Sequence, residues 1–124
     1  MITLGEFSIE EVLPYTGCRA YSRVFSVGNN FWKVKMQSQR YQIFKEKGLI
    51  CVCCGIVGAK FLLQMHENDK SPHFNLYAEK DGELILMTKD HIIPKSKGGS
   101  NHFSNLQPMC SLCNHLKDNS LKGQ

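Results

Sequence analysis

Several short stretches of the chain alternate between apolar and polar residues, which is the pattern of strands that bury one face. The first of them, residues 21–36, alternates around Gly28-Asn29-Asn30. Glycine and asparagine tolerate the positive φ of a tight turn, so this stretch predicts a hairpin. Asp81-Gly82 marks a second hairpin turn. Further strands are predicted by the same pattern at 59–64, 74–79 and 83–88.

Signals for helix starts and ends predict three short helices. Ser8 followed by Glu11 forms a capping-box pattern, so a helix is expected to begin there. Ser38 can cap a second helix, which Gly48 ends just after two lysines. A third helix is expected at 112–119. Short helices and strands in mixed order indicate an α+β fold.

The chain of 124 residues is 42% hydrophobic and 21% charged, which fits one small globular unit rather than a disordered chain. No apolar run approaches the roughly 20 residues of a membrane-spanning helix, so no membrane association is expected. The N-terminus lacks the basic and apolar regions of a secretory signal. We therefore expect a reducing cytoplasmic location, where the six cysteines serve metal binding or catalysis rather than disulfides.

The net charge of +4 is concentrated in one part of the chain, because residues 17–50 carry seven basic residues and one acidic residue. A basic segment with interleaved aromatic residues is a candidate nucleic-acid surface, although a solvated face is the simpler interpretation of charge alone. Phe25, Phe31 and Trp32 are expected to pack the hairpin rather than to stack on bases. The basic residues that precede the second helix are Arg19, Arg23, Lys33 and Lys35.

Two Cys-x-x-Cys pairs, Cys51/Cys54 and Cys110/Cys113, are the first candidate chemistry. Each spacing lets two thiolates of one tight turn reach the same Zn²⁺ at about 2.3 Å, and two pairs complete a tetrahedron. Four sulfurs leave no open coordination position, so the expected site is structural. Cys53 has poorer spacing and is expected to take no part. A thiol redox pair is the alternative, but two pairs without a thioredoxin-like element order disfavour it.

A second group of motifs lies at 90–99 and 105–117: Asp-His, Gly-Gly, Asn-Leu-Gln and Cys-x-x-Cys-Asn-x-x-Lys. Together they resemble the HNH endonucleases, whose site is built from two strands and a helix around one divalent ion. The resemblance covers these motifs and, more weakly, residues 40–55. It implies a small ββα-metal domain, similar to a treble clef, over residues 38–124. Residues 1–37 would form an N-terminal extension of a helix and a hairpin.

The resemblance implies a role for each matching residue. His91 would be the general base, since imidazole readily accepts a proton near neutral pH. Asp90 would ligate Mg²⁺ or Mn²⁺, and Asn105 would orient His91 and brace the loop. The third family position, usually histidine, falls on Asn114, whose amide oxygen suits a hard ion. His115 is the second candidate for this ligand.

These roles predict an endonuclease that hydrolyses DNA, with RNA left open as a substrate, in a bacterial cytoplasm as a bacterial or phage-encoded protein. Zn²⁺ would be structural, and Mg²⁺ or Mn²⁺ catalytic. One site cuts one strand, so a monomer should nick, and a homodimer could cut both strands. Phosphate contacts are expected from Lys95, Lys97 and Lys117 and from the N-terminal basic residues. The alternative is a zinc-stabilised nucleic-acid-binding module with a degenerate site, since Asn114 replaces histidine.

Overall fold

The computed structural model describes residues 1–17 and 22–122 of the chain. Its strands are β1 (Ile2–Phe7), β2 (Ser22–Val27), β3 (Asn30–Lys35), β4 (Gly58–Met65), β5 (His73–Lys80), β6 (Glu83–His91) and β7 (Leu106–Cys110). Its helices are α1 (Ile9–Val12), α2 (Gln39–Lys47) and α3 (Ser111–Lys122), with short 3-10 turns η1 (Leu13–Tyr15), η2 (Lys95–Lys97) and η3 (Phe103–Asn105). The α+β class predicted from the sequence is confirmed. Within this described part, no helix is long and apolar enough to cross a membrane.

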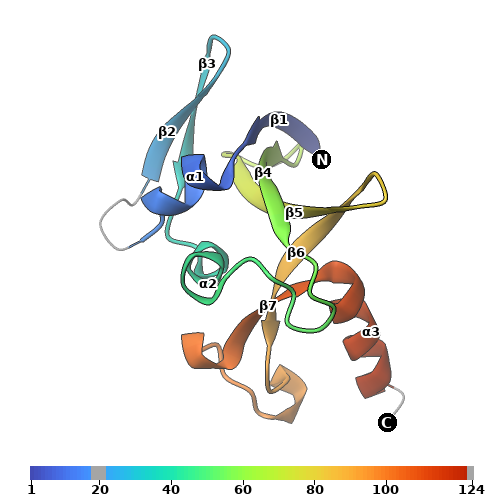
Figure 1. Cartoon of the computed structure of the whole chain (residues 1–124). Helices are drawn as coiled ribbons and strands as arrows, with labels where there is room; N and C mark the ends of the chain where they lie inside the picture. Colours follow the sequence, from blue (N-terminus) through green and yellow to red (C-terminus); the bar gives the residue numbers. More distant parts are fainter. Residues whose placement is uncertain (18–21, 123–124) are drawn as a thin grey trace.

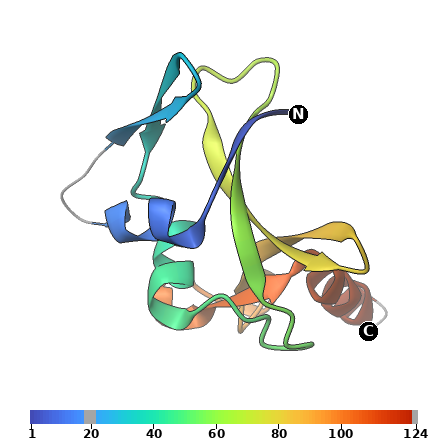
Figure 2. The ribbon, with the colours of Figure 1, turned by 45° about the horizontal axis from the view of Figure 1, so that its top comes forward.

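Five strands form one antiparallel sheet in the order β1-β4-β5-β6-β7, and β2 and β3 form a separate hairpin. The hairpin stands at one end of the molecule, and β7 and α3 lie at the other (Figures 1 and 2). β6 pairs with β5 through its first half and with β7 through its second half. The far end of β6 therefore extends beyond β5 and reaches the region that holds the candidate active site.

The start and end signals of the helices are confirmed. The Ser8 hydroxyl accepts a hydrogen bond from the backbone of Glu11, whose carboxylate in turn accepts one from the Ser8 backbone, at 3.2 and 2.9 Å. Ser38 caps α2, and Gly48 ends it with a φ of 105°. The first hairpin turns at Gly28, which has a φ of 59°. Local sequence signals therefore determine where these elements begin and end.

The structure contains two strands that the alternation pattern did not predict, β1 and β7. β1 contains a register shift between Thr3 and Gly5 that breaks its apolar–polar alternation. β7 contains Pro108, which has no N–H to donate. β7 lies at the edge of the sheet, where a proline is tolerated. Both strands complete the sheet on which the candidate site is built.

The core is centred on Phe74 of β5, which is fully buried. Its ring contacts four other aromatic rings edge to face, at centroid distances from 4.8 to 6.4 Å. These partners are Phe7, Phe25, Tyr41 and Phe61. They come from β1, β2, α2 and β4, so one cluster joins the hairpin, the helix and the sheet.

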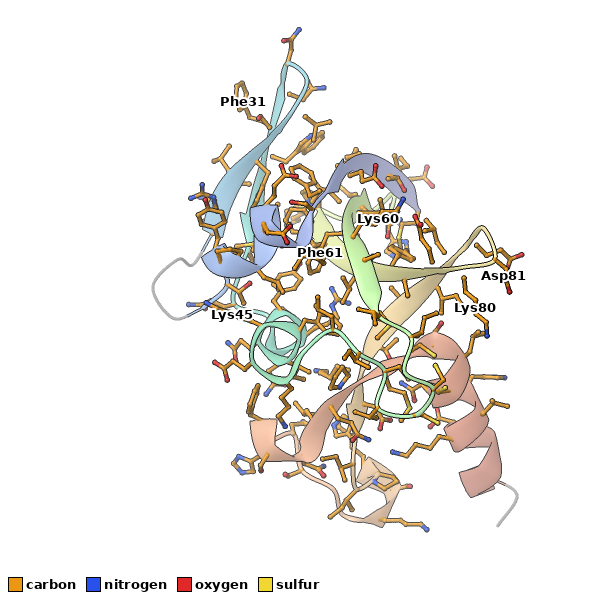
Figure 3. All side chains as sticks on the ribbon, in the orientation of Figure 1. Phe31, Lys45, Lys60, Phe61, Lys80 and Asp81 are labelled. Atoms are coloured by element: carbon orange, nitrogen blue, oxygen red, sulfur yellow. The ribbon has the colours of Figure 1, made fainter. Side chains whose placement is uncertain are left out.

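The predicted division of the chain at residues 37 and 38 stays a prediction. β1 pairs with β4 inside the five-stranded sheet, and Val34 and Met36 share one hydrophobic cluster with Leu106. Phe25 is buried as predicted, and Trp32 packs against this cluster. The prediction for Phe31 is wrong, because its side chain is 73% exposed at the end of the hairpin (Figure 3). Arg19 and Tyr21 lie outside the described residues.

Helix α2 connects the central sheet to the region of the site. The Tyr41 hydroxyl accepts a hydrogen bond from the backbone N–H of Phe74 at 2.8 Å, and Arg40 donates to the Phe74 carbonyl at 3.1 Å. At the other end of α2, the Lys47 ammonium donates to the carbonyls of Phe103, at 2.6 Å, and Leu106. The helix therefore fixes the start of β7 relative to β5.

We expect Phe74→Ala to lower the free energy of unfolding by about 3–5 kcal/mol, since it leaves a cavity among four aromatic rings. Phe31→Ala is the matched control and should change it by less than about 0.5 kcal/mol, because that ring is exposed. Chemical denaturation followed by circular dichroism measures both values. Equal effects of the two substitutions would contradict this description of the core.

Candidate metal centres and active site

The four predicted zinc ligands form one cluster. The Sγ atoms of Cys51, Cys54, Cys110 and Cys113 all lie within 4.8 Å of one another. The Cys54 and Cys110 sulfurs are 3.8 Å apart. Four ligands at about 2.3 Å in a tetrahedron place sulfurs about 3.8 Å from each other, so the cluster fits a structural Zn²⁺. Cys53 is exposed and stands outside the cluster, as predicted.

Backbone hydrogen bonds build the turn that carries the first cysteine pair. The N–H of Cys51 donates to the Ile56 carbonyl at 2.8 Å, and Gly55 donates back to the Cys51 carbonyl at 3.0 Å. Gly55 has a φ of 82°, which favours glycine at this position. The N–H of Val52 donates to the carbonyl of Pro108 at 3.1 Å. The turn is thereby attached to β7, and the two cysteine pairs face each other.

The thiols of the cluster differ in their acidity. Burial raises the pKa of Cys51, but backbone hydrogen bonds with Cys110 and with its own turn outweigh burial and lower it to about 6. Burial and hydrogen bonds with neighbouring sulfurs raise the pKa of Cys113. The backbone N–H of Cys113 also donates to the Cys110 sulfur at 3.4 Å. Burial nevertheless raises the pKa of Cys110, and this hydrogen bond only partly offsets it. A bound metal ion would favour the thiolate, which is the form that it binds.

A pocket of about 560 Å³ lies between the end of β6, the loop after it and α3. Asp90 and His91 are the last two residues of β6. Because the strand ends there, both residues line the same pocket, although successive strand residues face opposite sides. Asn114 and Lys117 reach the pocket from α3. The structure therefore brings together residues that are widely separated in the sequence.

Asp90 is nearly buried, at 5% exposure, and is held through one of its two carboxylate oxygens. Its Oδ2 accepts hydrogen bonds from the Lys117 ammonium at 2.8 Å and from the Gln107 amide at 2.9 Å. The Lys117 ammonium also donates to the carbonyl of His91 at 2.7 Å. Within the described chain, Oδ1 has no hydrogen-bond partner. Asp90 therefore keeps one oxygen that can bind a cation.

The orientation of the Asn114 amide follows from a chain of hydrogen bonds. The Thr88 hydroxyl donates its only proton to the Met109 carbonyl at 2.7 Å. It must therefore accept, not donate, in its 2.9 Å contact with Asn114. The nitrogen of the amide consequently faces Thr88, and its oxygen remains as a ligand atom. His115 is exposed and does not line the pocket.

The ring of His91 is held by a residue that no sequence motif indicated. Its Nε2 lies 2.8 Å from Oδ1 of Asn101. Asn105, which was predicted to orient His91, instead binds backbone atoms of the loop. Its Oδ1 accepts from the Ile93 N–H at 2.9 Å, and its amide nitrogen donates to the carbonyls of Ile93 and Ser100, at 3.1 and 2.8 Å. The predicted bracing of the loop is present, and the ring contact comes from Asn101.

The Gly-Gly pair gives this loop its shape. Gly98 ends η2 with a φ of 87°. A Cβ on Gly99 would lie 1.7 Å from the Ile93 carbonyl oxygen, so no other residue fits there. The close approach is to the chain's own backbone. The pair thus folds the loop back beside Asn101 and His91.

The residues predicted to contact phosphate do not form one group in the structure. Lys95 lines the pocket, whereas the Lys117 ammonium contacts Asp90 and the backbone of His91. The Arg23 guanidinium stacks 3.5 Å above the ring of Tyr15. Lys33 and Lys35 are exposed on β3, far from this pocket (Figure 1).

Residues 79–124 match the family model of the HNH endonucleases. The match includes β6, β7 and α3, and with them Asp90, His91, Asn105 and Asn114. This part of the chain is therefore similar to the HNH endonucleases, as its motifs predicted. The family indicates a nuclease-type or nucleic-acid-binding function and a nucleic acid as the substrate. No curated protein and no solved structure matches the chain.

We expect Cys113→Ser to lose bound zinc and much of the cooperative melting transition, because such clusters supply folding free energy to small domains. The control is Cys53→Ser, which removes an exposed thiol of the same region and should keep both properties. Zinc content by mass spectrometry and melting by circular dichroism test this. Full zinc content with unchanged melting in Cys113→Ser would refute a structural ion.

Proposed function

We propose that this chain is a metal-dependent endonuclease that hydrolyses phosphodiester bonds of DNA. The observation that carries the proposal is the arrangement of Asp90, His91 and Asn114 around one pocket. Two oxygen ligands and a histidine beside them are what metal-assisted hydrolysis of a phosphodiester requires. RNA is the other substrate that the same chemistry would accept, and a monomer with one such site would nick.

The residues present fit a hard divalent ion. Asp90 offers a carboxylate oxygen without a hydrogen-bond partner in the described chain, and Asn114 offers an amide oxygen. Oxygen ligands of these types suit Mg²⁺ or Mn²⁺ rather than softer metals. Such an ion would stabilise the negative charge that develops on the phosphate. Asp90 and Asn114 are its proposed ligands, and His115 is disfavoured.

His91 is the proposed general base. With Oδ1 of Asn101 as the acceptor, Nε2 of His91 carries the ring proton, and Nδ1 is the basic nitrogen. Asn105 holds the loop between His91 and Asn101 through three contacts with its backbone. Lys95 brings a positive charge to the same pocket and is suited to contact a phosphate.

One observation favours a second candidate, a nucleic-acid-binding module without catalysis. The ammonium of Lys117 contacts the same carboxylate that would bind the catalytic ion, and it already neutralises part of that charge. The enzyme is favoured because Lys117 contacts only one of the two carboxylate oxygens of Asp90, Oδ2, so the other oxygen can still bind an ion. A module without catalysis would also have no need for the Asn101–His91 contact.

Wild-type protein should relax supercoiled plasmid when Mg²⁺ or Mn²⁺ is added. His91→Ala should reduce the cleavage rate by about 100-fold or more, the usual contribution of a general base. Binding of the plasmid and zinc content should stay unchanged in this variant. Zinc must remain bound during the assay, so the metal-free control omits the divalent ion rather than adding a chelator.

Relaxation by His91→Ala at the wild-type rate would refute its role as base. Plasmid that shifts on a gel but is not cut by the wild-type protein with either ion would support the binding module instead.

Asn114→Ala and His115→Ala separate the two candidate ligands of the third family position. Loss of residues that merely support a metal ligand already costs about 10- to 100-fold, so Asn114→Ala should lose at least that much cleavage. It should also require more Mn²⁺ for half-maximal rate, whereas His115→Ala should behave as wild type. A larger loss in His115→Ala would reverse this assignment.

A further inference from the structure

A second pocket, of about 470 Å³, lies at the end of the molecule away from Asp90. It is formed by β3 and by the loop between β4 and β5. In both views the β2–β3 hairpin and this loop lie together, far from η2 and α3 (Figures 1 and 2). The pocket therefore does not belong to the candidate active site.

Side chains from both faces of the hairpin reach this pocket. Phe25 pairs with Trp32, and Phe25 and Val34 on that face are buried against the core. The opposite face carries the exposed Lys33 and Lys35. Both lysines and the half-buried Trp32 line the pocket. The sequence thus places two ammonium groups and a flat aromatic ring at one cavity.

The loop between β4 and β5 adds a third positive charge from the opposite side. Lys70 and Ser71 line the pocket there, and Ser22 lines it from β2. No acidic side chain is among the described residues that line it. The charged and hydroxyl groups of the pocket are therefore donors suited to an anion.

The three pocket lysines differ from several other lysines of the chain, which have partners. Lys45, Lys47 and Lys60 are engaged with backbone carbonyls or with glutamates. In the described residues, none of the pocket ammonium groups has a hydrogen-bond or ion-pair partner. Three such charges around one cavity repel each other, so an anion would stabilise this arrangement.

We propose that this pocket is a second nucleic-acid-binding site, which holds a nucleotide of the bound strand at a distance from the cleaved bond. Phosphates would contact Lys33, Lys35 and Lys70, and the sugar or base would pack beside Trp32. Phosphate with an adjacent flat apolar group is the ligand that matches both the charge and the aromatic wall. The choice of a nucleic acid as the ligand rests on the proposed endonuclease function. The pocket itself was not predicted, because Lys70 and Trp32 are distant in the sequence.

The position of the pocket has a consequence for binding. A nucleic acid that occupies both sites must extend from one end of the molecule to the other. Each lysine that contacts a phosphate adds about 0.9 to the slope of log Kd against log salt for duplex DNA, and about 0.7 for a single strand. Removal of the pocket charges should therefore weaken binding most at low salt, without changing the chemistry at His91.

The test uses the full chain with His91→Ala, zinc bound and no other divalent ion, so that binding is measured without cleavage. Trp32 is the only tryptophan of the chain and reports directly from the pocket wall. A fluorescently labelled oligonucleotide, single-stranded and duplex, is titrated at several salt concentrations. We expect its binding to change the emission of Trp32.

The variants are Lys33→Gln/Lys35→Gln/Lys70→Gln and the single change Lys70→Gln. Lys80→Gln is the matched control for Lys70→Gln, since it removes one exposed charge at another strand end (Figure 3). We expect the triple variant to lower the salt slope by about 2.1 for a single strand and about 2.7 for duplex DNA, and to abolish the Trp32 response. Lys70→Gln should lower the slope by about 0.7–0.9, and Lys80→Gln should leave it unchanged.

An unchanged Trp32 emission at saturating oligonucleotide, with a wild-type salt slope in the triple variant, would overturn the proposal. Equal competition by a glutamate-rich peptide of the same charge would also overturn it, because the pocket would then select acidic chains. If the wild-type protein does not cleave plasmid but these binding effects are observed, the proposed endonuclease activity is contradicted and the assignment of the pocket stands.

Discussion

The four-cysteine cluster is the constraint on which the rest of the site depends. It joins the turn at Cys51–Cys54 to the end of β7 and the first turn of α3. The direction of α3 decides whether Asn114 and Lys117 reach the end of β6. A Zn²⁺ held by these four thiolates would fix that direction and would add folding free energy to a small core. The arrangement of the candidate active site therefore depends on the cysteine cluster.

The candidate active site is built from polar contacts. Each contact holds a side chain through one of its polar atoms and leaves a second polar atom available for an ion or a proton. Lys117 and Gln107 hold one oxygen of Asp90 and leave the other. Thr88 takes the nitrogen of Asn114 and leaves its oxygen. Asn101 takes one nitrogen of His91 and leaves the second. Such support from neighbouring groups holds reactive atoms in place before substrate binds.

Much of this structure was predictable from local sequence, and the rest depended on long-range contacts. The helix caps, the hairpin turns and the zinc ligands follow from short motifs whose geometry is local. Strand β1 was missed because a bulge near Gly5 breaks its alternation, and β7 because Pro108 argues against a strand. Asn101 carries no spacing signal relative to His91, because only the folded loop brings them together. The role of Asn105 in bracing that loop was predicted, but its contact with the ring was not.

The most direct test of the central claim is a crystal structure of His91→Ala bound to uncleaved DNA and Mn²⁺, with the ion located by anomalous diffraction. We expect one Mn²⁺ per site, bonded to the carboxylate of Asp90, the amide oxygen of Asn114 and a phosphate oxygen. An ion bound through His115 would contradict the assignment of the ligands. An Asp90 carboxylate still paired only with Lys117, with DNA bound and no ion beside it, would contradict metal-dependent catalysis at this site.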